Sequence, residues 1–201
     1  TIPKNCEVID AKGMYISPGL IDIHIHGSKG ADTMDGSVEA INTMSNSIVE
    51  NGVTSFLPTT MAMDKEKIYK SFETIKEAMR TKNCGAKVLG AHMEGPFINV
   101  SYKGAQNSEF IIEPNFEIIK DYTDIIKIIS YAPEVDKDFE FTQYIKKHTN
   151  IILSICHSNL TYENAKAAIE HGASNITHLF NAMSPLNHRD PGVVGAALMS
   201  D

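Results

Sequence analysis

The chain has no tryptophan and only three cysteines among its 201 residues. Because Cys6, Cys84 and Cys156 are odd in number and far apart in the sequence, they suggest neither a disulfide framework nor a zinc site built from thiolates. No apolar run approaches the roughly 18 residues that a membrane-spanning helix needs, and the first residues do not resemble a signal peptide. These absences favour a protein of the reducing cytoplasm.

The chain also has few basic residues relative to acidic ones. The 18 lysines and arginines are outnumbered by 25 aspartates and glutamates, which gives a net charge of −7, and the lysines are scattered rather than clustered. We therefore expect neither a nucleic acid nor an anionic membrane as a partner. With 42% hydrophobic residues, the composition is that of a globular chain with one sizeable core.

The hydrophobic pattern alternates between strand-like and helix-like stretches. Short apolar runs predict strands within 17–27 and over 53–57, 86–94, 125–130, 151–157 and 174–180. A helical period predicts helices over 37–51, 65–82, 115–122, 137–148 and 161–171, with a further one opening at 192–199. This alternation indicates parallel strands joined by right-handed helical crossovers. No Gly-x-Gly-x-x-Gly follows the first strand, which argues against a dinucleotide-binding fold.

Six predicted strands are two short of the eight that close a (β/α)8 barrel, a fold of typically about 250 residues. The pattern leaves an open sheet or a piece of a longer barrel, and we favour the piece. We interpret residues 17–201 as an α/β domain, an incomplete TIM-type barrel with about six of its eight units. Residues 1–16, two short β-like pieces around a Lys-Gly turn, look like the edge of a second, mostly missing unit.

The stretch 17–27 carries the first chemical signal. Isoleucines and polar residues alternate in it, so a strand places Asp22, His24 and His26 together on one face. At about 3.3 Å rise per residue, the two histidine Cα atoms lie roughly 6–7 Å apart with parallel side chains. One metal ion is then within reach of both rings. Asp22 either orients a ligand histidine or accepts from backbone amides.

Histidine and glutamate recur where the other predicted strands end. Taken in order, these ends carry His92 and Glu94, then His157, then His178. In a parallel barrel the carboxyl ends of the strands converge on one rim, so these side chains are expected to meet. Imidazole and carboxylate suit zinc or another divalent first-row metal, and two close ions with a bridging carboxylate form a hydrolytic centre.

Each of these residues also has a plainer interpretation. Glu94 precedes a Gly-Pro turn and could accept backbone hydrogen bonds there. His92 shares the parity of Glu94 and is more typical of a residue that supports a ligand or lines the substrate. Cys156 has the opposite parity to His157, so the pattern predicts that it packs among the helices.

The loop after the last predicted strand contains candidate anion-binding groups. Arg189 offers a planar fork that suits a phosphate, and Asn181 can hydrogen-bond a hydroxyl or an amide. The alternative is a surface ion pair between Arg189 and Asp190, which contributes little. The sequence of the loop leaves both interpretations open.

Several motifs resemble a known family. These are PGLIDIHIHG at 18–27, GAHMEGPFIN at 90–99, HSNLT at 157–161, THLFNAM at 177–183 and RDPG at 189–192. The first is similar to the first-strand motif of the amidohydrolase superfamily. The others are similar to its family of deacetylases that act on N-acetylglucosamine 6-phosphate, and the similarity runs from about Val8 to the last residue.

The resemblance implies a metal-dependent hydrolase that converts N-acetylglucosamine 6-phosphate to glucosamine 6-phosphate and acetate. It implies a divalent cofactor, one or two ions of zinc, iron or manganese. The main ion would be held by Glu94, His157 and His178, and a second by His24 and His26, with Glu94 bridging the two.

The resemblance also implies a binding site for the sugar phosphate, in a homodimer whose Arg189 reaches the neighbouring subunit's substrate. The residues implied to contact the sugar phosphate are Ala105, Asn181, Ala182 and Arg189. Residues 1–16 would be the remnant of a small β-sandwich domain. The catalytic aspartate is expected beyond Asp201, so we expect the 201-residue chain alone to bind metal weakly and to turn over little.

Two alternatives stay open from the sequence. Another amidohydrolase, such as a cyclic-imide hydrolase or a deaminase, would keep the His-x-His pair but should not need Arg189 or the Asn181-Ala182 loop. From a different class, the chain could be a metal-binding or assembly module without catalytic activity.

Overall fold

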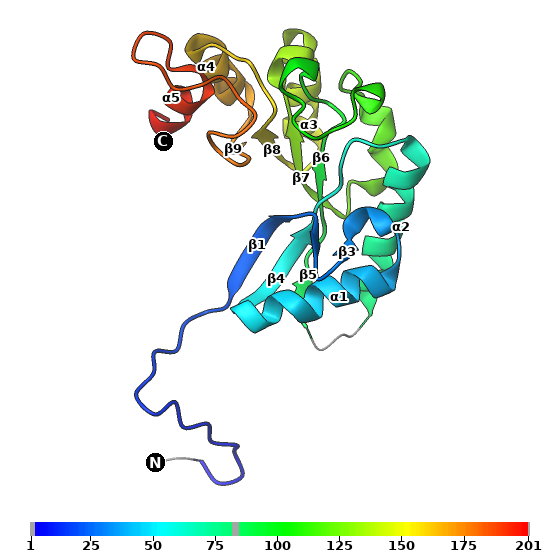
Figure 1. The fold of residues 1–201 in the computed structure, drawn as a ribbon, viewed down its shortest axis with the longest axis vertical. Coiled ribbons are helices and arrows are strands. Elements are labelled where there is room, and N and C mark those ends of the chain that lie inside the picture. The colour runs from blue at the N-terminus through cyan, green and yellow to red at the C-terminus, as the bar shows by residue number, and fades with distance from the viewer. Residues whose placement is uncertain (1–2, 82–84, 201) are drawn as a thin grey trace.

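The computed structural model describes residues 3–81 and 85–200. Two sheets form its framework (Figure 1). The first contains β1 (Leu20–Ile25), β4 (Val53–Pro58) and β5 (Lys87–Val88). The second contains β6 (Ala91–Glu94), β7 (Ile126–Tyr131), β8 (Ile152–Ile155) and β9 (Asn175–Ile176). Within these two sheets of the described chain every strand pair is parallel, whereas β2 (Gly27–Ser28) and β3 (Ala31–Asp32) form a small antiparallel pair.

The two sheets join where the residues that follow β4 pair with β6. Thr59 forms a parallel bridge with His92, and the amide of Thr60 donates to the His92 carbonyl at 3.0 Å. Neighbouring strands therefore follow one another in chain order, without the reversal that marks a doubly wound sheet. Figure 1 shows the strands along an arc from β1 to β9. The predicted α/β fold with parallel strands, of the type found in TIM barrels, is confirmed at this level.

Helices follow the strands as the periodicity predicts. They are α1 (Val38–Ile48), α2 (Lys65–Arg80), α3 (Glu140–His148), α4 (Tyr162–His171) and α5 (Gly192–Leu198). The main core packs α1 and α2 against the sheets, with Phe56, Phe72 and Met93 fully buried. A second cluster packs α4 and α5 against β8. None of the described helices combines the length and apolar character that crossing a bilayer requires.

Two predicted elements take a different form. Residues 115–122 form two separate 3-10 turns, Phe116–Ile118 and Lys120–Tyr122, instead of one helix. The stretch is short enough that nucleating an α-helix costs more than its few hydrogen bonds return. The predicted strand 86–94 is divided at Gly90, whose φ of 154° bends the chain where a Cβ would lie 2.3 Å from the Ile125 carbonyl.

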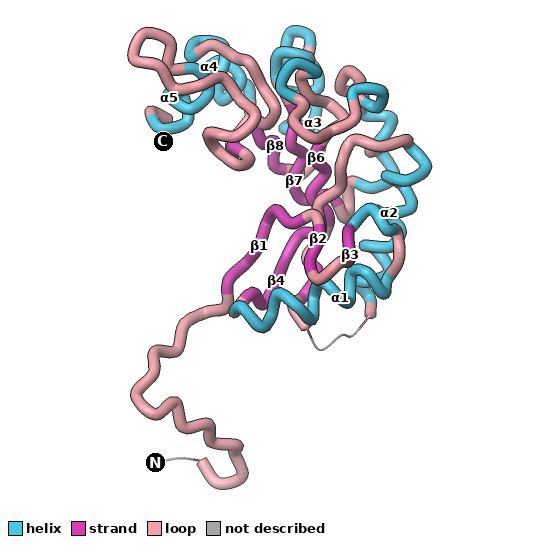
Figure 2. The backbone as a smooth tube through the Cα atoms, in the orientation of Figure 1, coloured by secondary structure: helices cyan, strands magenta, loops and turns pink. Residues whose placement is uncertain are grey.

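The N-terminal segment forms no strand within residues 3–16, so the two short β-like pieces predicted there are absent. Figure 2 draws this segment as loop that extends away from the sheets. Val8, Ile9 and Tyr15 are exposed, because no other described segment lies alongside to pair with the backbone. The assignment of residues 1–16 to a second domain stays a prediction.

Helix α1 offers a simple test of the local structure. The Ser37 hydroxyl accepts from the amide of Ala40 at 3.2 Å and caps the helix. Replacement of Ser37 by alanine is expected to lower the free energy of unfolding by about 1 kcal/mol. Urea titration measures this loss, and Asn46→Ala, at an exposed position inside the same helix, is the control. Equal stability of the two variants would contradict the capping role.

Candidate metal centre

Glu94 lies at the centre of a histidine cluster at the carboxyl end of β6. The residue is buried, and each of its carboxylate oxygens faces a different group. Oε1 lies 2.9 Å from Nε2 of His157 and 3.1 Å from Nε2 of His178. Oε2 lies 2.8 Å from Nε2 of His26 and 3.9 Å from Nε2 of His24. One carboxylate therefore connects histidines from three separate parts of the chain.

Three of these histidines are oriented in the same way. In His26, His157 and His178 the Nδ1 atom contacts a backbone carbonyl, which can only accept, so Nδ1 carries the proton. Nε2 is then the atom that faces Glu94, an arrangement typical of metal-ligating histidine. The carbonyls are those of Thr59, Tyr102 and Asn181, at 3.2, 2.7 and 3.1 Å respectively.

His24 and His26 come from β1 as the alternation predicts. This strand turns its histidines toward Glu94 and leaves Ile21 and Ile23 exposed on its other face. The Nδ1 atom of His24 is buried without a hydrogen-bond partner. Leaving a buried polar atom without a partner costs free energy. Because the His24 ring also lies against the rings of His26, His92 and His178, this cost fits a residue whose role is to bind a ligand.

His157 and His178 lie just beyond their strands, on left-handed backbone. Their φ angles are 47° and 35°, a conformation that costs a residue with a side chain of order 1–3 kcal/mol. The strand β8 ends at Ile155 and β9 at Ile176, so the strand alternation no longer applies to either histidine. The strained backbone turns both rings toward Glu94, as is common at functional sites.

The cluster shifts the pKa values of Glu94, His26 and His178. Burial would raise the pKa of Glu94, but hydrogen bonds from His157, His178 and His26 hold it well below its usual range. Burial lowers the pKa of His26, yet the bond to Glu94 raises it above its ordinary value. The same bond raises the pKa of His178. The carboxylate is thus an anion surrounded by nitrogen donors.

The donor set fits divalent metal ions. Among the described residues two groups have ligand atoms within 4.8 Å of one another, and Glu94 belongs to both. The first consists of Glu94, Cys156, His157 and His178, and the second of His24, His26 and Glu94. Histidine and carboxylate are ligands of zinc and other first-row divalent ions. The shared carboxylate would let the two groups hold one ion each.

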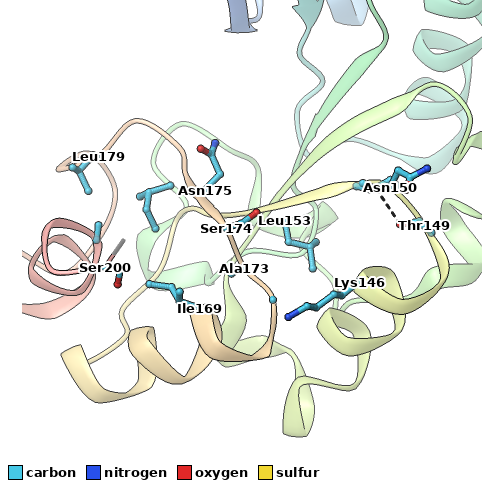
Figure 3. Close-up of a pocket in the computed structure, with 14 residues that line it drawn as sticks. Lys146, Thr149, Asn150, Leu153, Ile169, Ala173, Ser174, Asn175, Leu179 and Ser200 are labelled. Atoms are coloured by element: carbon cyan, nitrogen blue, oxygen red, sulfur yellow. Dashed lines mark hydrogen bonds between the residues drawn. The ribbon is translucent and has the colours of Figure 1, made fainter.

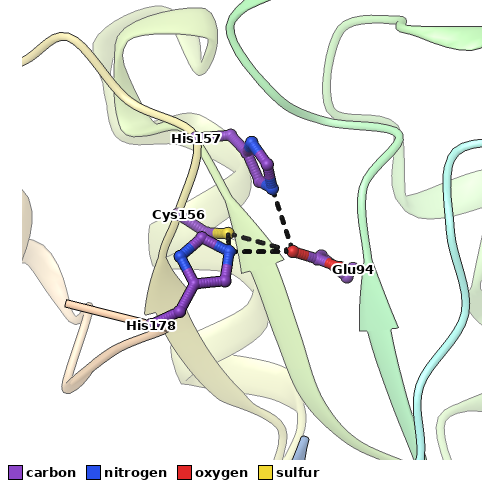
Figure 4. A group of neighbouring side chains, drawn as sticks. All are labelled: Glu94, Cys156, His157 and His178. Atoms are coloured by element: carbon purple, nitrogen blue, oxygen red, sulfur yellow. Dashed lines mark hydrogen bonds and ion pairs between the residues drawn. The ribbon is translucent and has the colours of Figure 1, made fainter. Parts of the chain in front are cut away.

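The position of Cys156 differs from the prediction. Its side chain is fully buried, but its Sγ lies 3.5 Å from Oε1 of Glu94 and 3.4 Å from Nε2 of His178. Figure 4 shows these side chains beside one another. The prediction assumed that the strand continues through His157. Because β8 ends at Ile155, the cysteine keeps the inward parity of Ser154 and His157 turns in after it.

The supporting residues have clear partners. Asp22 accepts from the backbone amide of His24 at 3.0 Å, so the backbone-amide alternative describes its contact. The Nδ1 atom of His92 donates to the Ile23 carbonyl at 2.6 Å, and its Nε2 lies 2.6 Å from the Ser130 hydroxyl. Both ring nitrogens of His92 are therefore engaged, and the ring fastens β1 to β6 and β7.

Of the predicted substrate residues, Ala105, Asn181 and Ala182 lie on loops beside His157 and His178. Ala105 is exposed and follows Gly104, where a Cβ would lie 3.4 Å from Cε1 of His157. The carbonyl of Asn181 accepts from His178, and that of Ala182 accepts from the amide of Ser158. Arg189 is exposed, and none of the ion pairs found in residues 3–81 and 85–200 includes it.

Sequence reasoning missed the carbonyls that orient the histidines. Thr59 and Tyr102 contribute only backbone oxygen, and no side-chain pattern signals that role. It also missed Gln106, which is buried and whose Oε1 accepts from the amide of Ala62 at 2.5 Å. Because the Cβ position of Gly95 lies 3.6 Å from that Oε1, Gln106 packs beside the turn that follows Glu94.

A separate hollow of about 710 Å³ opens beside the amino ends of β8 and β9 (Figure 3). It lies among α3, α4 and α5 and is lined by residues such as Lys146, Asn150 and Ser174. None of the residues that line it belongs to either metal group. The hollow and the histidine cluster are therefore distinct features of the chain.

Parallel strands that gather histidines and a glutamate at their carboxyl ends are typical of metal-dependent hydrolases of the barrel type. Residues 15–199 match the amidohydrolase family. The chain belongs to this family, whose members are metal-dependent.

Its relatives narrow the comparison further. The chain is 40% identical over 206 residues to an N-acetylglucosamine-6-phosphate deacetylase of Bacillus subtilis, covering 99% of this chain and 52% of the relative. The crystal structure of the enzyme of that name from Pasteurella multocida superposes with a TM-score of 0.89 at 37% identity, over 100% of this chain and 53% of that one. The Thermotoga maritima structure gives 0.81 at 33% identity, over 92% and 49%. The chain thus spans about half the length of the relatives it matches.

Proposed function

We propose that the chain supplies the metal-binding part of a site that hydrolyses the acetamide of N-acetylglucosamine 6-phosphate to glucosamine 6-phosphate and acetate. The observation that carries the proposal is Glu94, with one oxygen toward His157 and His178 and the other toward His26. The names of the relatives supply the substrate.

The metal ligands proposed are Glu94, His157, His178, His24 and His26. One or two divalent ions of zinc, iron or manganese held there supply Lewis acidity toward the acetamide carbonyl and water that ionises near neutral pH. The chain's part is to hold Nε2 of each histidine in place through Nδ1 and a fixed carbonyl. The aspartate that would accept the water's proton and return it to the leaving amine is expected beyond residue 201.

The remaining predicted residues are assigned to the sugar phosphate. Asn181 and Ala182 lie on the loop beside His178, and Ala105 lies on the loop beside His157. Arg189 is assigned to bind the phosphate. For the fold, the proposal is that the parallel strands belong to about six of the eight βα units of a (β/α)8 barrel. Residues 1–16 would belong to a small β-sandwich domain. A cytoplasmic homodimer completes the proposal.

The test is acetate release by a chimera in which this chain replaces the matching half of the Bacillus subtilis relative. N-acetylglucosamine 6-phosphate is the substrate, and unphosphorylated N-acetylglucosamine and a cyclic imide are run alongside. Metal-dependent release that is much faster with the phosphorylated sugar than with the unphosphorylated one supports the proposal. A folded, metal-loaded chimera that hydrolyses only the imide would indicate another amidohydrolase, and one without any turnover would favour a non-catalytic metal module.

Arg189 provides a sharper prediction about the phosphate. In the same chimera, Arg189→Gln is expected to raise KM for the phosphorylated sugar at least about tenfold, because it removes a charge-assisted bidentate contact. Turnover of the unphosphorylated sugar should stay unchanged. His188→Gln, one residue earlier on the same exposed loop, is the control. Equal loss with both sugars would contradict a phosphate-specific role.

A further inference from the structure

Among the described residues of the two metal groups, Cys156 is the one that the proposed ligand set leaves unused. It is fully buried at the end of β8. Figure 4 shows it beside His178 and Glu94, and its ligand atom lies within 4.8 Å of those of Glu94, His157 and His178. The group is therefore a set of four donors from three strand ends rather than an isolated cysteine.

The two contacts of the Cys156 sulfur have the spacing of ligands in a tetrahedral site. Zinc binds nitrogen and oxygen at about 2.0–2.2 Å and sulfur at about 2.3 Å, so tetrahedral ligand atoms lie roughly 3.3–3.7 Å apart. The Sγ atom is 3.4 Å from Nε2 of His178 and 3.5 Å from Oε1 of Glu94. The Nε2 contacts of His157 and His178 to Oε1, 2.9 and 3.1 Å, are shorter because a shared hydrogen draws the atoms together.

We propose that Cys156 is a fourth ligand, through its thiolate, of the metal ion held by Glu94, His157 and His178. The thiol proton leaves to the solvent as the metal–sulfur bond forms, so the charge of the site falls by one. The inference rests on the proposed function only in that both place a metal on those three residues.

A thiolate ligand changes which metal ions the site prefers. Sulfur ligands favour zinc, cadmium and cobalt over manganese and magnesium, which prefer oxygen. Four protein ligands also close a tetrahedral site, whereas catalytic zinc keeps an open position. The group of His24, His26 and Glu94 offers only three donors. That second group therefore keeps an open position, and an ion in the first group takes up water or substrate by expanding to five ligands.

The experiment uses cobalt as a probe of sulfur ligation. Cys6 and Cys84 are replaced by serine in the full 201-residue chain, so that Cys156 is the only thiol. One equivalent of Co²⁺ is added to the metal-free protein, binding is measured by equilibrium dialysis, and the near-ultraviolet spectrum is recorded. We expect an intense sulfur-to-cobalt charge-transfer band that appears with bound metal and is lost in Cys156→Ser.

Affinity gives a second, independent readout. Removing even a hydrogen-bond partner of a ligand costs about 10–100-fold in metal affinity, so the preference for Cd²⁺ over Mn²⁺ should fall at least about tenfold in Cys156→Ser. Ser154→Ala is the matched control, because Ser154 is also buried on β8 but bonds to Thr177 rather than to the cluster. It should keep the band and the preference.

The outcomes separate the two proposals. The single-thiol chain keeps Cys156 unchanged. If it binds cobalt without a sulfur charge-transfer band, Cys156 is not a ligand, and the metal site of histidines and Glu94 still stands. An unchanged cadmium preference in Cys156→Ser also overturns the thiolate ligand. Failure to bind any cobalt, with the fold intact by circular dichroism, overturns both this ligand and the metal site on which the proposed function depends.

Discussion

Replacement of Glu94 by glutamine is expected to lower the affinity of the chain for a divalent ion by more than about 100-fold. Removing a supporting contact of a ligand already costs about 10–100-fold, and Glu94 is placed as a ligand in both groups. Glutamine keeps the size but has one amide nitrogen, which cannot bind a metal ion. In either orientation, one of the two groups loses its carboxylate oxygen and both lose the negative charge.

Isothermal titration with Zn²⁺ and Mn²⁺ measures this loss, after the metal has been removed with a chelator. Glu109→Gln is the control, because Glu109 is an exposed carboxylate on the loop that follows β6. An affinity for both ions within about threefold of the unchanged chain would show that Glu94 is not a ligand. That result would mean that the arrangement of the histidines around Glu94 is not explained by metal binding to its carboxylate.

The position of the site could be predicted from sequence because it depends on the ends of strands. The alternation in β1 places His24 and His26 on one face, and the structure turns that face toward Glu94. Parallel strands bring their carboxyl ends to one edge, so His178 meets a carboxylate 84 residues earlier in the chain. Periodicity and strand direction suffice for this part of the prediction.

The orientations of Cys156 and His157 and the carbonyl that orients His157 could not be predicted from the sequence, because they depend on backbone outside regular strands. The left-handed φ of His157, just beyond the end of β8 at Ile155, turns His157 toward the cluster although Cys156 before it also faces the cluster. Parity holds only while the strand continues. The carbonyl of Tyr102, which orients His157, comes from a loop whose side chains give no sign of it. Such contacts depend on tertiary packing.

The ring of His92 connects the fold to the site and makes stability depend on pH. Its Nδ1–H donates to the Ile23 carbonyl, so Nε2 accepts from the hydroxyl of Ser130 and the ring is neutral. The Ser130 hydroxyl in turn accepts from Thr177, and Thr177 from Ser154. Burial lowers the pKa of His92 from 6.5 to about 4. A proton on Nε2 would oppose the direction of this whole chain of hydroxyls.

Acidification is therefore expected to remove about 2–3 kcal/mol of stability through His92 between pH 7 and pH 4.5. Below pH 6.5 the unfolded chain binds a proton at His92 while the folded chain does not until about pH 4, so the free energy of unfolding falls as pH falls across that window. Urea titrations of the metal-free chain at both pH values, with His92→Gln beside the unchanged chain, isolate this residue from the other histidines. The stability difference between the two proteins should shrink by that amount at the lower pH, and a difference that does not change with pH would contradict a neutral, buried His92.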